Sequence, residues 1–483
     1  MIERASEDPY VFVTKTNNAD NAMKFTLWTA WSEAFSELRP AFSRKLTFLW
    51  ASIFCAGMAV RPDTRGVSSI VACFSLKTKA YKSLLGLCHS SAIDLDKLLA
   101  AWIRLCFKLF SPACLEGYMV LIADGIKVGK EGKKMPAVKS LHQDSQSNAK
   151  AKFIMGHYLQ AVSLLVVSPF KRHLAVPLVA QIHDGIAQPK SSYKSCITKL
   201  ADLILQIVAY AEIPTIVIAD AYFSVKNLIE PLSMHGCRLI SRVKHNVVAY
   251  TPVLPTHKKK RGRPRLKGDR VELSELFKDF NRISIPLGDK RYFSVDLYWP
   301  SAGGIVRFVL VSNSKGKAIL MSTDTSIEPE QIIKLYESRW LIETGFKVSK
   351  HQLGMFFYHF WMKKMDKTKS GQLQQDLTNK SKKYRQKVEQ KIRSYHIFLA
   401  LGCISHGLLI YLSANYSKDV WGSFTGWLRT IRPDLEPSEL VTANALRSTL
   451  PNFLVAENMD FEWKKLLLEK VDYTRSDVFR KTG

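Results

Sequence analysis

The chain has 483 residues, which is enough for roughly two to four domains of ordinary size. Its hydrophobic fraction is 47% and its charged fraction 23%, so disorder is not the default interpretation. There are 70 Lys and Arg against 42 Asp and Glu, which gives a formal net charge of +28. Such a chain repels itself unless a polyanion neutralises it, and nucleic acid is the commonest such partner.

The cysteines, the N-terminus and the apolar stretches indicate a cytoplasmic protein. The eight cysteines form no CxxC pair and no zinc-finger spacing with histidine, which argues against structural zinc and suits a reducing compartment. The N-terminus carries acidic residues where a signal peptide needs a basic start and an apolar run. The longest apolar stretches, Thr47 to Val60 and His396 to Leu412, favour buried helices over membrane spans. We therefore expect a cytoplasmic, nucleoid-associated protein with no membrane partner.

Residues 1–115 are expected to form a helical N-terminal domain that binds DNA. Apolar residues recur at helical spacing from Leu95 to Phe110. The preceding segment TRGVSSIVACFSLKTKAYKSLLGL has the pattern of a helix-turn-helix, although any small helical domain shows a similar one.

Residues 116–244 are expected to form the first part of an α/β core. Periodicity and turn residues predict, in chain order, strands at Tyr118 to Asp124, Phe153 to Val167 and His173 to His183, a helix at Ser195 to Ala211, a strand at Pro214 to Asp220, a helix around Val225 to Met234 and a strand at Cys237 to Lys244. This order of elements is that of an RNase H-like core, in which helices flank a mixed sheet.

The rest of the chain divides into three further parts. Residues 245–325 hold a basic run and short alternating stretches, which predict a β-rich insertion into the core. Residues 326–415 are expected to complete the core with a long helix from Glu328 to about Lys350, a Lys-rich segment and an apolar helix from His396. Residues 416–483 form a mostly helical C-terminal region.

Two aspartates, Asp124 and Asp220, stand at the ends of apolar strands, where α/β sheets commonly place their chemistry. A carboxylate there is costly unless something pairs with it. Two carboxylates brought together repel each other, and a divalent cation such as Mg²⁺ resolves that repulsion. The alternative is that each aspartate merely caps the turn or helix that follows it.

The segment QIIKLYESRWLIETGFKVSK adds a third acid. At about 100° per residue, Tyr336, Arg339, Glu343, Lys347 and Lys350 share one stripe of a helix, bordered by apolar residues. Glu343 can thus point into a site while its basic neighbours meet phosphates. The alternative is a helix with ordinary charge pairs, since Arg339 and Glu343 stand four residues apart.

The spacing Tyr336-x2-Arg339-x3-Glu343-x6-Lys350 resembles the Y-R-E-K signature of one large group of DDE transposases from bacterial insertion sequences. The sequence ADGIKVGKEG resembles that group's first aspartate region, and VIADAYFS resembles its second. A β insertion between the second aspartate and the glutamate is also a feature of the group. The resemblance spans about residues 118–412.

The resemblance implies an enzyme of cut-and-paste DNA transposition. Asp124, Asp220 and Glu343 would be its catalytic and metal-binding residues. Asp124 would bridge two Mg²⁺ ions, Asp220 would bind one and Glu343 the other, and Mn²⁺ could substitute. Water would cleave DNA at the end of the element, and the freed 3′-OH would attack the target. The partners implied are double-stranded DNA at element ends and target, and a second copy of the chain in a homodimer on DNA.

Residues of the same helix are expected to contact DNA. Arg339 and Lys350 would hold phosphates near the cut, Arg339 through its bidentate fork. Tyr336 would bind a phosphate or support Glu343. Lys347 shares the stripe and is a further candidate.

Candidate DNA contacts also lie outside that helix. Arg242 is one. The basic run His257 to Arg270 contains RGRP, which resembles an AT-hook core whose Arg261 and Arg263 would enter a minor groove, or serves as a generic phosphate-gripping loop. Members of the group can pass through a DNA hairpin aided by an aromatic that stacks a flipped base. Trp299 is a candidate for that role, and packing within the sheet is its favoured alternative.

Two questions stay open from the sequence. Met362 to Arg393 holds eleven Lys and Arg and three acids, and it either contacts DNA or forms a solvated linker. The chain could also be another RNase H-like nuclease, which the insertion and the signature disfavour. A catalytically inactive, transposase-derived DNA-binding protein is the other alternative, which the intact Asp124, Asp220 and Glu343 disfavour.

Overall fold

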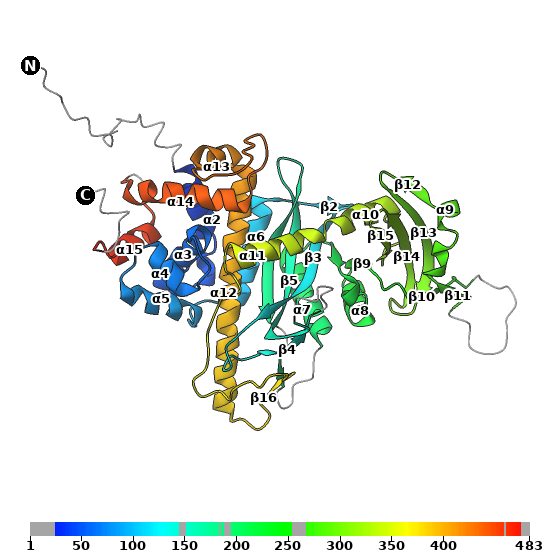
Figure 1. Cartoon of the computed structure of the whole chain (residues 1–483), viewed down its shortest axis with the longest axis horizontal. Helices are drawn as coiled ribbons and strands as arrows, with labels where there is room; N and C mark the ends of the chain where they lie inside the picture. The colour runs from blue at the N-terminus through cyan, green and yellow to red at the C-terminus, as the bar shows by residue number, and fades with distance from the viewer. Residues whose placement is uncertain are drawn as a thin grey trace, which may run out of the picture.

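In a computed structural model of the chain, the structure describes residues 25–143, 151–182, 185–187, 195–253, 267–457 and 460–474. Within these residues a 14-stranded mixed sheet crosses the middle of the molecule, and a helical body stands at one end of it (Figure 1). One continuous hydrophobic core runs through both, from Phe25 to Val471. The expected mixed α/β class, with helical regions at either end of the chain, is confirmed.

The expected helical N-terminal region is confirmed from residue 25 onward. Its helices are α2 (Thr26–Ser36), α3 (Lys45–Val60), α4 (Val67–Cys73), α5 (Thr78–Cys88) and α6 (Leu95–Leu109), with a short helix η1 (Arg39–Ala41). Helix α6 begins where expected because the Asp94 carboxylate accepts hydrogen bonds from the backbone N–H groups of Asp96 and Lys97, at 3.2 and 3.1 Å. Helices α4 and α5 cover the helix-turn-helix segment.

The two ends of the chain pack against each other. The C-terminal helices are α13 (Ser417–Ser423), α14 (Glu439–Val455) and α15 (Glu462–Lys470). The Trp28 indole donates to the carbonyl of Leu446 at 3.1 Å and stacks on Phe453 with ring centroids 5.5 Å apart. The Trp463 indole donates to the Ser32 hydroxyl at 3.1 Å. The first and last helices therefore form one helical body, seen side by side in Figure 1.

Five strands make up the centre of the sheet. They are β3 (Tyr118–Gly129), β5 (Phe153–Val167), β6 (His173–Ile182), β8 (Thr215–Ala219) and β9 (Arg238–Arg242). They lie in the order β6, β5, β3, β8, β9, with β5 antiparallel to its neighbours and β3, β8 and β9 parallel. This is the mixed sheet expected of an RNase H-like core. Strand β3 continues past Asp124 to Gly129.

Helices cover this sheet on its faces. They are α7 (Cys196–Ala211), α8 (Lys226–Met234) and α12 (Lys382–Asn415), and a short helix η2 (Ala221–Phe223) follows β8. Helix α12 is long and apolar enough to cross a membrane, but 89% of its apolar window is buried in this fold, as expected of a core helix. The expectation that it starts at His396 is wrong: the Ser381 hydroxyl caps it by accepting from the backbone N–H of Tyr384 at 3.3 Å. Its first turns are rich in lysine, so they lack an apolar signal.

The predicted β-rich insertion is confirmed, and it lengthens the core sheet. Its strands are β10 (Val248–Tyr250), β11 (Arg270–Glu272), β12 (Ile285–Leu287), β13 (Lys290–Trp299), β14 (Gly304–Asn313) and β15 (Gly316–Ser322), with short helices η3 (Glu275–Phe277) and α9 (Phe280–Ile283). Strand β15 pairs antiparallel with β9, Met321 opposite Ser241. The remaining short strands are β1 (Ser111–Pro112), β2 (Cys114–Leu115), β4 (Lys139–His142), β7 (Ile186–Ala187) and β16 (Gln375–Asp376).

The single helix expected from Glu328 to about Lys350 is two helices, α10 (Pro329–Glu337) and α11 (Trp340–His351). At the junction, backbone N–H groups bond to the carbonyl three residues earlier instead of four. Arg339 bonds to Tyr336 at 3.0 Å, and Leu341 bonds to Ser338 at 3.1 Å. The two helices follow one another across the molecule (Figure 1).

Candidate active site

Strand register brings Asp124 and Asp220 together. Ala123 on β3 pairs with Ala219 on the parallel strand β8. The residue that follows each alanine is an aspartate, Asp124 within β3 and Asp220 directly after β8, so the two carboxylates lie at the same level of the sheet and on the same face. The prediction that each acid stands at a strand end is therefore correct for Asp220, which directly follows β8, and wrong for Asp124, because β3 continues to Gly129.

Asp124 is mostly buried, and the other two acids act on it electrostatically. Its side chain is 16% exposed, and it accepts a hydrogen bond from the backbone N–H of Gly125 at 2.7 Å. A Cβ at Gly125 would lie 2.3 Å from the Tyr158 hydroxyl, so glycine lets this tyrosine pack beside the site. Burial raises the pKa of Asp124 to about 6, and the carboxylates of Asp220 and Glu343 act in the same direction.

Arg339 joins two of the three acids. Its Nη1 lies 3.1 Å from Asp124 Oδ2, and its Nη2 lies 2.6 Å from Glu343 Oε1. The Tyr336 hydroxyl donates to Asp220 Oδ1 at 3.4 Å, and burial raises the pKa of Tyr336 to about 12, which keeps this donor protonated. One helix junction thus supplies a partner to each of the two aspartates.

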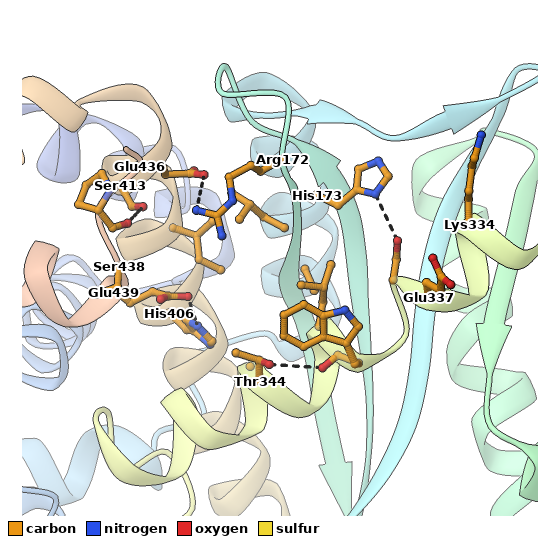
Figure 2. A pocket seen from close by; sticks show the side chains of 18 residues that line it. Arg172, His173, Lys334, Glu337, Thr344, His406, Ser413, Glu436, Ser438 and Glu439 are labelled. Atoms are coloured by element: carbon orange, nitrogen blue, oxygen red, sulfur yellow. Dashed lines mark hydrogen bonds and ion pairs between the residues drawn. The ribbon is translucent and has the colours of Figure 1, made fainter. Parts of the chain in front are cut away.

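A cavity of about 620 Å³ on another side of α11 shows what holds this helix (Figure 2). A hydrogen bond of 3.2 Å joins Ser338 to His173 Nδ1 on β6. Further along, Ser349 bonds to the buried His406 Nδ1 at 3.1 Å, and the His406 ring faces Glu439 Oε1 at 3.5 Å. These residues position the helix that carries Glu343. These residues leave little trace in the sequence, where a histidine inside an apolar stretch is their one visible signal.

The predicted basic residues Arg242, Lys347 and Lys350 lie on elements that also hold or adjoin the site. Arg242, at the end of β9, is exposed, and its charge acts on Tyr336 to lower the pKa of that hydroxyl against the effect of burial. Lys347 and Lys350 are exposed on α11, one and two turns beyond Glu343.

Trp299 is not brought to the acids. Trp299 is 5% exposed and packs against Phe308 inside the insertion, with ring centroids 5.9 Å apart. This is the sheet-packing alternative described above. Arg261 and Arg263 lie outside the described residues.

The acids have the chemistry of a divalent-metal site. In the part of the chain that the structure describes, no three His, Cys, Asp or Glu side chains are arranged to hold a metal ion as they stand. However, Asp124 and Glu343 both reach the one guanidinium of Arg339, so a single cationic group can contact both. The Glu343 side chain is 52% exposed and therefore has room to rotate. Three carboxylates at a partly solvated edge are ligands that Mg²⁺ prefers.

Residues 135–357 match the family model of the transposase DDE domain. The matched range holds Asp220, Tyr336, Arg339 and Glu343, and it begins after Asp124. No curated protein matches the chain. The similarity to the DDE domain indicates a DNA-processing enzyme.

Proposed function

We propose that this chain is a DDE transposase that cuts DNA at the ends of a mobile element and joins them to target DNA. The observation that carries the proposal is that one helix junction contacts all three acids. Arg339 bonds to Asp124 and Glu343, and the Tyr336 hydroxyl donates to Asp220. These acids come from two strands and a helix that are far apart in the sequence. Within the transposases, the Tyr336-to-Lys350 spacing supports the Y-R-E-K group of bacterial insertion sequences.

Asp124, Asp220 and Glu343 would hold the metal, Mg²⁺ or in its place Mn²⁺. When bound there, a pair of such ions activates a water and stabilises the leaving oxygen during in-line attack on a phosphodiester. Tyr336 would keep Asp220 oriented through its hydroxyl. Arg339 would use its planar fork to hold a phosphate beside the acids, since its two outer nitrogens already span the gap between two carboxylates.

The charge of the chain fits a DNA partner. A net charge of +28 gives strong, salt-dependent attraction to a polyanion. Arg242, Lys347 and Lys350 are exposed on β9 and α11 and would contact the strand that enters the site. Two element ends need two active sites, so we propose that the protein acts on DNA as a homodimer in the bacterial cytoplasm.

The test uses purified protein and labelled duplexes that carry the DNA flanking the coding sequence on each side. With Mg²⁺ we expect cleavage at a matched pair of inverted repeats, followed by joining of the 3′ ends to a plasmid. Asp220→Ala should abolish both steps and keep DNA binding. Cleavage without joining would favour another RNase H-like nuclease. Binding without any cleavage by the wild type would favour an inactive DNA-binding protein.

A further inference from the structure

The loop between α11 and α12 is fastened to the core. We call residues 361–391 the Lys-rich cap. The Gln375 amide accepts from the backbone N–H of Ala137 at 2.8 Å and donates to the carbonyl of Met135 and to the Thr368 hydroxyl, both at 2.9 Å. Strand β16 of the cap pairs in parallel with β7. These bonds exclude the solvated linker that the sequence left open.

The cap also has a small hydrophobic core of its own. Met362, Met365, Leu377 and Val388 are buried against one another. Hydrogen bonds to the core and these buried residues fix the backbone of the cap, so its surface side chains have defined neighbours. Charge on this surface can therefore act as a site.

A concavity of about 670 Å³ opens between the start of the cap and the first turns of α12. Its charged and aromatic lining includes Lys363, Lys364, Lys383, Lys387, Lys391 and Trp361. No residue of this lining, within the described chain, carries a carboxylate. Five lysines around one hollow make it strongly electropositive.

Two of the three acids of the cap are engaged with residues that do not line the hollow. Asp366 pairs with Lys380 at 2.7 Å, and Asp376 accepts from the backbone N–H of Thr378 at 2.8 Å. Inside the hollow, Lys391 Nζ lies 2.7 Å from His89 Nε2, and burial lowers the pKa of Lys391. An ammonium group partly removed from water beside other cations is costly, and a bound anion would relieve that cost.

The hollow also suits an extended nucleic acid. Trp361 is 66% exposed at its edge, where an indole can pack on a sugar or a base. The cap is bonded to the loop that follows β3, through the N–H groups of Met362 and Thr368 and the carbonyls of Lys134 and Lys133 at 2.9 and 2.7 Å. It therefore lies at the end of the sheet toward which β3 runs after Asp124 (Figure 1).

We propose that this hollow grips the phosphate backbone of duplex DNA that continues beyond the cleavage site. The inference rests on the proposed function, which makes duplex DNA the substrate. It concerns a part of the chain beyond the family match, which ends at Phe357. Lysine is the appropriate residue, because each ammonium neutralises a phosphate and releases a counterion without reading the sequence.

The test removes three lysines, as Lys364→Ala, Lys383→Ala and Lys387→Ala together. Fluorescence anisotropy with a labelled duplex in EDTA measures affinity over a range of salt. We expect affinity to fall about tenfold or more, and the slope of log affinity against log salt to fall by about 2 to 3, because each lost phosphate contact removes about 0.9. Lys364→Arg, Lys383→Arg and Lys387→Arg together should retain affinity, since arginine keeps the positive charge that contacts the phosphates.

A charge-matched control removes Lys418, Lys465 and Lys470, which lie at the surface of the C-terminal helices α13 and α15. It should change affinity by less than about twofold. Equal losses in the two triple variants would overturn the proposal, as would a loss of single-stranded RNA binding with duplex binding intact. Circular dichroism melting checks that both variants fold. As a second readout, Trp361→Phe should remove part of the fluorescence quenching that DNA causes, and unchanged quenching would count against the hollow.

The proposal and the proposed function can fail separately. If the wild type never cleaves but the Lys-rich cap variant loses duplex affinity, the hollow stands and the transposase assignment falls. If the wild type cleaves and the cap variant binds like the control, the hollow is not a DNA site and the assignment stands.

Discussion

The acidic site and the Lys-rich cap are both DNA-facing regions in this account, but they are built in opposite ways. The acidic site has three carboxylates, and strand register and one helix junction fix their positions. The cap has five lysines around a hollow, most of them exposed, on a loop and a helix end. Cleavage of a phosphodiester thus needs a few groups in defined places, whereas binding of the DNA backbone needs a high density of positive charge on a stable surface.

Glu343→Gln should have the largest effect and should separate the two regions. We expect cleavage to fall by about 10³-fold or more, because the amide cannot replace a carboxylate ligand, while duplex affinity stays within about twofold of the wild type. Single-turnover cleavage and anisotropy on the same duplex measure the two quantities. Full activity in this variant would remove Glu343 from the site.

Arg339 sharpens the comparison, because it is a cation within the acidic site. Arg339→Ala and Arg339→Lys should each lower the cleavage rate by about 10²-fold, since neither restores the planar fork. Arg339→Ala should also tighten Mn²⁺ binding in the absence of DNA, because Asp124 and Glu343 lose a competing cation. Wild-type activity in Arg339→Lys would show that charge alone suffices there.

Gln375→Leu should break the cap while leaving the acids in place. It removes the hydrogen bonds to Ala137 and Met135 and leaves buried backbone groups without partners, a loss of about 1 to 3 kcal/mol. Hydrogen exchange should rise across residues 361–381, and duplex affinity should fall. Gln374→Leu is the matched control, because that side chain is exposed. Equal hydrogen exchange in the two variants would show that Gln375 does not hold the cap to the core.

Low pH should destabilise the protein through the buried hydrogen bond between His157 and Tyr358, which lies next to the cap. His157 bonds to the Tyr358 hydroxyl at 2.9 Å, and burial lowers the pKa of His157 to about 3. In the unfolded chain this histidine has the ordinary pKa of about 6.5. Its contribution to the free energy of unfolding is therefore fully present above about pH 6.5 and is lost as the pH falls toward 3. At pH 5.5 the loss is about 1 kcal/mol from this residue.

Urea unfolding at pH 7.5 and 5.5 measures this loss. His157→Gln should lower the pH dependence, and the exposed His235→Gln should leave it unchanged. An identical pH dependence in the wild type and His157→Gln would show that His157 does not couple protonation to folding.

The sequence predicts the local elements well, because helices and strands leave periodic patterns of apolar residues. It also predicts the three acids, because each has a recognisable place in such a pattern. The strand Phe153 to Val167 was predicted with the observed bounds, and Asp124 and Asp220 stand at the ends of buried runs. The stripe that carries Glu343 follows from helical spacing alone.

The features that the sequence does not predict depend on contacts between distant parts of the chain. The pairing of β15 with β9, which merges the insertion with the core, joins residues about 80 positions apart in the register of Met321 and Ser241. The polar first turns of α12 carry no apolar period, so its start was predicted too late. The contact of Arg339 with Asp124 has no local signature, since spacing shows only its relation to Glu343.

The most direct test is Mn²⁺ binding in the absence of DNA, measured by electron paramagnetic resonance of the free ion. If the acids of β3, β8 and α11 form one site, then Asp124→Asn, Asp220→Asn and Glu343→Gln should each weaken binding by about tenfold or more. Wild-type binding in any one of the three would contradict a shared site.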